Sequence, residues 1–380
     1  MKCPRCLNTD RRYFYKGSKG WYCRRCISFG RILIQEERTP AQTPKLHEGA
    51  EEYILAYPLT PAQKRIGHEA AIALEKQDVL IEAVCGAGKT EMTIEAIART
   101  LAQKKTVCFA IARRQVVLEI RDRLAGLFPG ARVTAVCQGF TSVTEGDIIV
   151  ATTHQLYRYE KRFDLLILDE PDAFPFRGNP VLHGIAETAC RGHRLFLTAT
   201  PDAVLKKRTA DGSLLCLYLN RRPHGHDLPE PVLFASVLPV LMIRLLHWLK
   251  THPGPRMVFA PTIREARLLS LFLSLFFPCS CCTSKTENRD EVIENFRKRK
   301  NGVIVATTVL ERGVTIPGAD ICVFHADHGV FDEASLIQMA GRAGRSFSSP
   351  DGSVLFLLMK RSRTAEECRS RIKEANRCAA

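Results

Sequence analysis

The chain has 380 residues, of which 46% are hydrophobic and 25% charged, and these values are ordinary for a soluble globular protein. This length allows two or three domains that each bury a core, and no low-complexity segment or short repeat is present. The net charge of +15 says nothing about the fold, but it favours polyanionic partners such as nucleic acid or an acidic membrane surface.

Neither an exported nor a membrane-spanning chain is indicated. The N-terminus, MKCPRCLNTD, has no apolar core of a secretory signal. The longest apolar stretches are residues 268–277 and residues 232–248, the latter interrupted by Arg244. A membrane crossing needs about 20 apolar residues, so both stretches are predicted to be buried helices. The fifteen cysteines are then expected to be reduced thiols or metal ligands rather than disulfides.

The first block, residues 1–48, is rich in cysteine, arginine and aromatic residues. CPRC (3–6) and CRRC (23–26) form a C-x2-C-x16-C-x2-C array, the spacing of a structural zinc site with four thiolates. The predicted Zn²⁺ ligands are Cys3, Cys6, Cys23 and Cys26. Basic and aromatic residues alternate around them, which favours a surface for nucleic acid or a partner. Alternatively, the aromatics form only the miniature core of this module.

Residues 49–222 alternate short apolar runs with helical periods, the pattern of a parallel sheet built from βαβ units. The predicted strands are residues 78–84, 106–112, 147–153, 164–170 and 194–200. AVCGAGKT (83–90) lies between a strand and a helix-like segment, the context of a phosphate-binding loop. The predicted nucleotide-binding residues of this loop are Gly86, Ala87, Gly88, Lys89 and Thr90, with Lys89 at the β and γ phosphates and the Thr90 hydroxyl on Mg²⁺.

LLILDEPD (165–172) provides a second element of a nucleotide site. An apolar strand that ends in two carboxylates places Asp169 near Mg²⁺ and Glu170 near an attacking water. Such a pattern alone is usually a strand reaching solvent. Eighty residues after Lys89, within the same block, it predicts ATP hydrolysis.

RRPHGHDLPEP (221–231) is rich in proline, glycine and histidine and is predicted to be a linker. The alternation then resumes, and strands are predicted at residues 256–262, 302–308, 320–326 and 352–358. QMAGRAGR (338–345) in this second block provides Arg342 and Arg345, whose rigid guanidinium groups suit phosphate. We expect them to face the triphosphate held by the first domain, so that hydrolysis depends on domain closure.

The motif set resembles superfamily 2 helicases and translocases, through AVCGAGKT, DEPD, TAT (198–200), TTVLERGVT (307–315) and QMAGRAGR in this order. The resemblance implies that Gln63 recognises adenine, that Gln338 joins the arginines at the γ-phosphate, and that Thr198 and Thr200 link the ATP site to the nucleic-acid track. The residues that it implies along this track are Arg113, Arg114, Thr152, Thr153, Thr308, Arg312 and Gly313.

The flanking residues resemble the ComFA late-competence family more closely: DEPDAFPF, CGAGKTE, ATTHQL, the RRPHGHDLP linker and the four-cysteine module. This resemblance covers essentially the whole chain. It implies an ATPase that drives transforming single-stranded DNA into the cytoplasm. It also implies a cytoplasmic position, peripheral at the inner face of the membrane, beside an uptake channel and other competence proteins.

The predicted fold is therefore α/β, with two tandem RecA-like parallel-sheet domains (49–222 and 223–380) and an N-terminal four-cysteine zinc-binding module (1–48). The predicted enzyme is a DNA-dependent ATPase, with ATP, Mg²⁺ and Zn²⁺ bound. The alternatives are a replication-restart or RNA helicase, and a zinc-dependent DNA-binding adaptor that uses ATP only as a switch. CSCC (279–282) is predicted to be buried thiols, RKRK (297–300) a solvated helix end, and His224 and His226 have no assigned role.

Overall fold

The computed structural model describes residues 1–34, 45–299, 301–311, 316–347 and 349–378. The chain forms two compact units. The first contains residues 1–83 and 88–219, and the second contains residues 84–87 and 220–380. The domain boundaries 48/49 and 222/223 remain predictions. Among the helices that the structure describes, none combines the length and apolarity needed to span a membrane.

The core of the first unit is a seven-stranded sheet in the order β5-β6-β4-β7-β8-β3-β9, with every pair of neighbours parallel. Its strands are β3 (Val79–Ala83), β4 (Val107–Ile111), β5 (Val133–Val136), β6 (Ile148–Thr152), β7 (Phe163–Asp169), β8 (Cys190–Thr198) and β9 (Leu215–Leu219). The five strands predicted for this block are confirmed. Helices bury the side chains on both faces of a parallel sheet, so each of its strands is a nearly continuous apolar run that can be recognised in the sequence.

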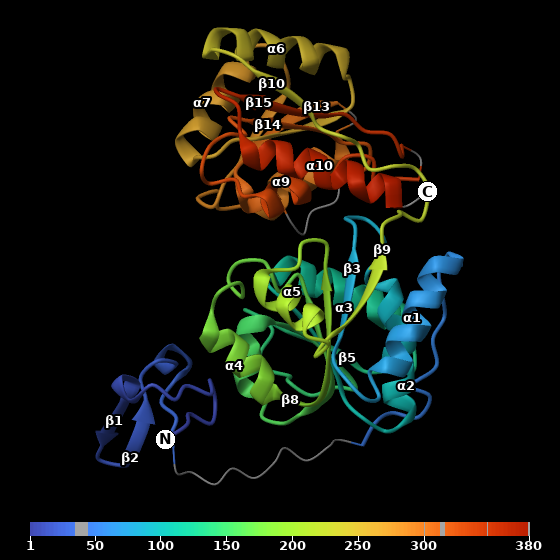
Figure 1. Ribbon diagram of the computed structural model, residues 1–380, viewed down its shortest axis with the longest axis vertical. Coiled ribbons are helices and arrows are strands. Elements are labelled where there is room, and N and C mark those ends of the chain that lie inside the picture. The colour runs from blue at the N-terminus through green and yellow to red at the C-terminus, as the bar shows by residue number, and fades with distance from the viewer. Residues whose placement is uncertain (35–44, 300, 312–315, 348, 379–380) are drawn as a thin grey trace. The chain divides into compact units, whose positions relative to one another are not determined.

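Helices cover both faces of this sheet (Figure 1). They are α1 (Pro61–Ala73), α2 (Ile94–Ala102), α3 (Arg114–Leu127), α4 (Pro180–Ala189) and α5 (Ala203–Ala210). Leu182, Ile185 and Ala186 of α4 pack against strand residues such as Leu80 and Leu166 in one buried cluster. Helix α1 begins at Pro61, directly after the capping residue Thr60, because threonine is a favourable N-cap and proline is favourable at the first helical position.

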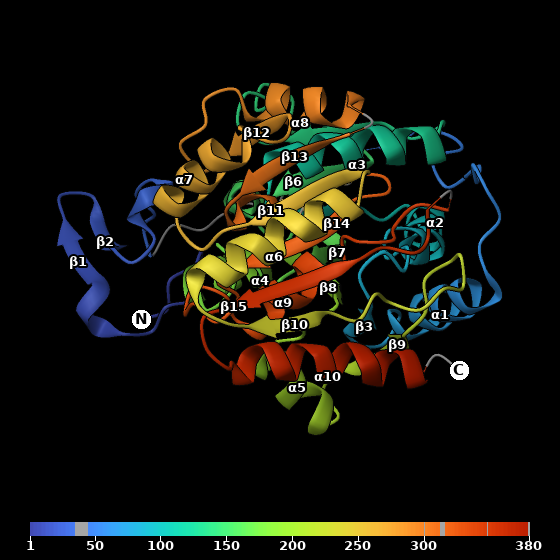
Figure 2. The same ribbon diagram turned by 90° about the horizontal axis from the view of Figure 1, so that it is seen from above.

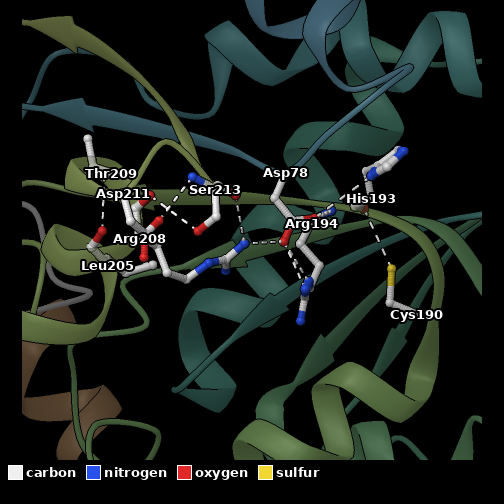
Figure 3. A network of polar contacts seen from close by, with 9 residues as sticks. All are labelled: Asp78, Cys190, His193, Arg194, Leu205, Arg208, Thr209, Asp211 and Ser213. Atoms are coloured by element: carbon white, nitrogen blue, oxygen red, sulfur yellow. Dashed lines mark hydrogen bonds and ion pairs between the residues drawn. The ribbon is translucent and has the colours of Figure 1, made fainter.

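A carboxylate joins three elements of the first unit (Figure 3). Asp78, the residue before β3, accepts hydrogen bonds from the Arg194 backbone N–H at 2.9 Å and from Arg208 Nη2 at 2.8 Å. Burial alone would raise the pKa of Asp78, but the hydrogen bond from Arg208 and the charge of Arg194 outweigh it, so this pKa lies below its usual value. The pair of arginines therefore ties β3 to β8 and α5.

The N-terminal module is part of the first unit and packs on α4. It contains an antiparallel hairpin of β1 (Phe14–Gly17) and β2 (Gly20–Cys23). The Thr188 hydroxyl, from α4, donates to the Arg5 carbonyl at 3.1 Å. The Phe29 ring lies 5.3 Å from that of Tyr157, and Val181 packs against the cluster formed by the module's cysteines. The module therefore shares an apolar contact with α4.

The second unit contains a six-stranded parallel sheet in the order β10-β15-β14-β11-β13-β12. Its strands are β10 (Val232–Ala235), β11 (Pro255–Phe259), β12 (Cys279–Cys282), β13 (Gly302–Ala306), β14 (Asp320–Phe324) and β15 (Val354–Leu358), and its helices are α6 (Leu238–Thr251), α7 (Ile263–Leu273), α8 (Arg289–Lys298), α9 (Glu333–Ala340) and α10 (Arg363–Cys378). Helices α6 and α7 pack on one face, as Figure 2 shows, and α8, α9 and α10 on the other.

Three predictions for this unit need correction. Residues 232–248 are not one helix, because residues 232–235 form the edge strand β10; short apolar runs do not distinguish strand from helix by periodicity. Residues 268–277 are not fully buried, since only one face of α7 covers the sheet and Leu271 is 70% exposed. CSCC forms the strand β12, in which Cys282 is buried while Cys279 and Cys281 are half-buried.

Candidate nucleotide site and metal centre

The phosphate-binding loop follows β3 directly and leads into the 3-10 turn η3 (Glu91–Thr93) and then α2. Gly86 and Gly88 have φ of +85° and +79°, a backbone conformation that favours glycine. A Cβ atom on Gly88 would lie 2.3 Å from Gln63 Nε2. The close approach of a side-chain amide therefore also requires glycine at this position.

The ammonium of Lys89 forms an ion pair with the Glu170 carboxylate, and both side chains are largely buried. Glu170 follows the last residue of β7, Asp169, and has φ of +53°, an uncommon conformation for a residue with a Cβ. Its N–H donates to the Leu197 carbonyl at 2.8 Å, which fixes this turn to β8. The structure thus brings the loop lysine and the predicted catalytic carboxylate together.

The other predicted ATP residues of the first unit lie around the same loop. Gln63 lies in the first turn of α1, where its Oε1 accepts from the Thr60 N–H at 3.0 Å in a capping box. The amide nitrogen of Gln63 then occupies the space next to Gly88 that a Cβ atom would need. Thr90 is 9% exposed and precedes η3, and Asp169 ends β7. A hydroxyl and a carboxylate are oxygen donors of the kind that Mg²⁺ prefers.

A polar group beside this loop was missed in the sequence. The Tyr57 hydroxyl donates to Glu91 Oε1 at 2.8 Å, and Arg123 Nη2 donates to the Tyr57 hydroxyl at 2.9 Å while also pairing with Glu91. Glu91 follows Thr90 directly, so this group braces the start of η3. Its members come from three separate segments, and only Glu91, the last residue of CGAGKTE, lies in a motif.

Thr198 and Thr200 meet at one carboxylate. Both hydroxyls donate to Asp172, from Thr200 at 2.7 Å, and the Thr200 N–H donates to Thr198 Oγ1 at 2.9 Å. All three residues are buried. Asp172 is the last residue of DEPD, and no role was predicted for it. It links the segment after β7 to the segment after β8.

Most of the predicted nucleic-acid residues of the first unit lie at the carboxyl ends of β4 and β6. The phosphate-binding loop follows the carboxyl end of β3 and so lies at the same edge of the sheet. Ligands of parallel sheets bind outside this edge, so the position of these residues fits a ligand-binding surface. Arg113 precedes α3, and Arg114 is exposed and donates to the Gln138 carbonyl at 2.8 Å. Thr152 ends β6 half-buried, whereas Thr153 is only 2% exposed.

In the second unit, Gln338 lies in α9, and Arg342 and Arg345 lie in the segment that follows it. Arg342 Nε donates to the Glu311 carbonyl at 2.9 Å, and Arg345 Nε donates to the Gly341 carbonyl at 2.7 Å. Thr308 lies in the turn η5 (Thr308–Leu310) after β13. The two remaining predicted track residues, Arg312 and Gly313, lie outside the described residues. The roles of all these residues remain predictions.

The four cysteines of the N-terminal module converge. Their Sγ atoms all lie within 4.8 Å of one another, with Cys3 to Cys26 at 3.7 Å and Cys6 to Cys23 at 3.9 Å. A tetrahedral zinc ion with bonds of about 2.3 Å needs sulfur atoms roughly 3.8 Å apart. The donor set therefore fits Zn²⁺.

Comparisons with known proteins agree with this geometry. The model of the helicase conserved C-terminal domain matches residues 239–347, and that of the type III restriction enzyme res subunit matches residues 56–203. The S. cerevisiae Dbp5 structure bound to RNA and ADP BeF3 has a TM-score of 0.65 at 18% identity, covering 83% of this chain and 87% of that one. RecG bound to a three-way DNA junction has a TM-score of 0.61 at 21% identity, covering 85% and 45%. The fold and the site define an ATP-dependent, helicase-like protein of superfamily 2, with two RecA-like domains.

Two sequence relatives narrow this class. The competence protein ComFA of Bacillus subtilis is 31% identical over 100% of this chain and 86% of its own length. That of Streptococcus pneumoniae is 35% identical over 93% of this chain and 85% of its own length. The chain belongs to the ComFA family of competence proteins. The predicted family and the predicted fold class are both confirmed.

Proposed function

We propose that this protein is a DNA-stimulated ATPase that translocates on single-stranded DNA and drives transforming DNA into the cell. The observation that carries this proposal is the ion pair between Lys89 and Glu170, which joins the phosphate-binding loop to the acidic end of β7. Membership of a competence family supplies the biological setting.

The geometry suggests how the first unit handles ATP. A triphosphate on the loop would attract the Lys89 ammonium away from Glu170, because phosphate oxygens carry more negative charge than one carboxylate. Glu170 would then orient the attacking water, while the Gln63 amide would recognise adenine. Thr90 and Asp169 would hold Mg²⁺, which neutralises phosphate charge when bound.

Arg342 and Arg345, with Gln338, would bind the terminal phosphate in a closed state. An arginine delivered in this way increases the rate by about 10³- to 10⁵-fold. Hydrolysis then depends on closure, so each turnover is coupled to a change in the relation of the two domains. A protein that uses ATP only as a switch would not need this complete hydrolytic set.

The DNA would run along the carboxyl ends of β4 and β6 and continue near Thr308. Asp172 connects Thr198 and Thr200 to the end of β7, so this group supports coupling between the two ligands. The basic cysteine module, with structural Zn²⁺, adds a second surface for single-stranded DNA or a partner. We place the protein in the cytoplasm at the inner face of the membrane, beside the uptake channel and other competence proteins.

The decisive experiment is ATP turnover measured without polynucleotide and with single-stranded DNA, duplex DNA or RNA. We expect single-stranded DNA to raise turnover most, and Lys89→Ala to abolish it. Wild-type ATP turnover that is equally fast without any polynucleotide would refute the proposal of a DNA-dependent motor. Stronger stimulation by RNA or by duplex DNA would favour an RNA or replication-restart helicase. Wild-type turnover no faster than that of Glu170→Gln would favour the adaptor.

A further inference from the structure

The linker after β9 forms a compact turn that contacts the segment after α9. The Arg222 side chain is buried, and its Nη1 donates to the carbonyls of Ala343 and Gly344, both at 2.7 Å. Its Nη2 donates to the Gly341 carbonyl at 2.9 Å. One guanidinium thus holds three carbonyls of what we call the arginine loop, Gly341–Arg345, and its Nε donates to a fourth carbonyl, that of Cys85, at 2.9 Å.

A histidine of the same linker adds a fourth bond to the arginine loop. His224 Nδ1 accepts from the His226 N–H at 3.1 Å, so the ring hydrogen of the neutral imidazole lies on Nε2. His224 Nε2 lies 3.1 Å from the Gly344 carbonyl, to which it therefore donates. The His224 ring also packs edge-on against Phe347, with the centroids 5.9 Å apart.

These bonds fix the backbone from which the two predicted catalytic arginines project. The Gly341 and Ala343 carbonyls flank Arg342, and the Gly344 carbonyl belongs to the peptide bond that leads into Arg345. The loop is tightly turned, since a Cβ atom on Gly344 would lie 2.2 Å from the Pro350 carbonyl oxygen. Burying a guanidinium is unfavourable, and desolvation, with the charge of Arg345, lowers the pKa of Arg222 to about 10. A connection that only joined two domains would gain nothing from this burial.

We propose that Arg222 and His224 are positioning residues, which hold the arginine loop so that Arg342 and Arg345 meet the terminal phosphate in a productive geometry. This inference rests on the proposed function. Electrostatic catalysis requires donors that are placed before the reaction, and a misplacement of about 1 Å can lower the rate about 100-fold. The linker therefore sets turnover without contacting the nucleotide.

The test compares linker variants of the full-length protein. With saturating single-stranded DNA, Arg222→Gln should lower kcat about 10- to 100-fold. The Kd of a fluorescent ATP analogue should rise by a much smaller factor, since only one of the four bonds of Arg222, that to the Cys85 carbonyl, belongs to the phosphate-binding loop. The matched control is Arg221→Gln. Among the described contacts, the exposed Arg221 side chain donates only to the Gly225 carbonyl, which lies within the linker. It should leave kcat within about two-fold of the wild-type value. An Arg222→Gln protein with wild-type kcat, or one that loses nucleotide binding in parallel, would overturn the inference.

A milder pair covers the case in which Arg222→Gln does not fold. His224→Ala removes the donor to Gly344 and should lower kcat about three- to ten-fold, whereas His224→Gln retains an N–H donor and should recover most of this loss. Equal kcat values for these two variants would contradict a positioning role for His224.

A combined variant separates failure of the inference from failure of the proposed function. Replacing both Arg342 and Arg345 by alanine should lower kcat at least about 10³-fold, and adding Arg222→Gln should cause little further loss. Wild-type turnover in the Arg342/Arg345 variant would reject the proposed function itself. A full additional loss on adding Arg222→Gln would reject only the positioning role.

Discussion

Asp172→Asn tests the link between β7 and β8. The carboxylate accepts hydrogen bonds from the hydroxyls of Thr198 and Thr200, and all three residues are buried. An amide is uncharged and has one acceptor oxygen, so both hydroxyls lose their charged acceptor and one of them faces an NH2 group instead. A hydrogen bond to a charged group contributes about 1.5–3 kcal/mol, and a neutral replacement recovers about 1 kcal/mol. We therefore expect the free energy of unfolding to fall by about 1–3 kcal/mol.

In a unit of this size each kcal/mol lowers Tm by about 2–4 °C, so thermal melting should detect the change. ATP turnover with and without single-stranded DNA gives the functional readout. The stimulation ratio should fall about ten-fold while the affinity for a fluorescent ATP analogue is retained, because Asp172 bonds to the two threonines that we propose couple the ATP site to the DNA. Asp202→Asn is a matched control, since Asp202 caps α5 and asparagine caps equally well. A wild-type stimulation ratio in Asp172→Asn, or an equal loss in the control, would refute this reasoning.

Three further outcomes are expected. Asp78→Asn should lower the free energy of unfolding by about 1–3 kcal/mol at pH 7 in denaturant titrations. Because the folded pKa of Asp78 is below the unfolded value of about 3.9, this difference should shrink as the pH falls below about 4, and a constant difference would contradict it. Cys3→Ser should abolish stoichiometric zinc in elemental analysis, and an unchanged metal content would exclude the four-cysteine site. Glu170→Gln should bind ATP with turnover reduced at least about 100-fold, and a near-normal rate would remove Glu170 from the reaction.

The sheets could be predicted from the sequence because their strands are buried on both faces and appear as unbroken apolar runs. The phosphate-binding loop and the cysteine array could also be predicted, since each is a short sequence pattern whose residue types and spacing serve a single kind of chemistry. The four edge strands, β5, β9, β10 and β12, were not predicted, because apolar runs of four or five residues that are only partly buried carry no clear period of their own.

The contacts that sequence reasoning missed join distant segments. Asp172 binds hydroxyls 26 and 28 residues further along the chain, and Arg222 binds carbonyls about 120 residues away. Backbone carbonyls are present at every residue, so no side-chain pattern at residues 341–344 indicates that an arginine binds them. Only the folded topology brings these partners together.

The seat of the cysteine module on α4 has a practical consequence. Val181 and Thr188 of this helix both contact the module, and α4 begins shortly after the DEPD segment. Chelators or oxidants that disrupt the four-cysteine cluster would remove the apolar contact between the module and Val181 of α4. If the four cysteines hold Zn²⁺, loss of the ion would weaken the support of α4 next to the DEPD segment, so oxidation of the N-terminal thiols would also lower the stability of the first unit.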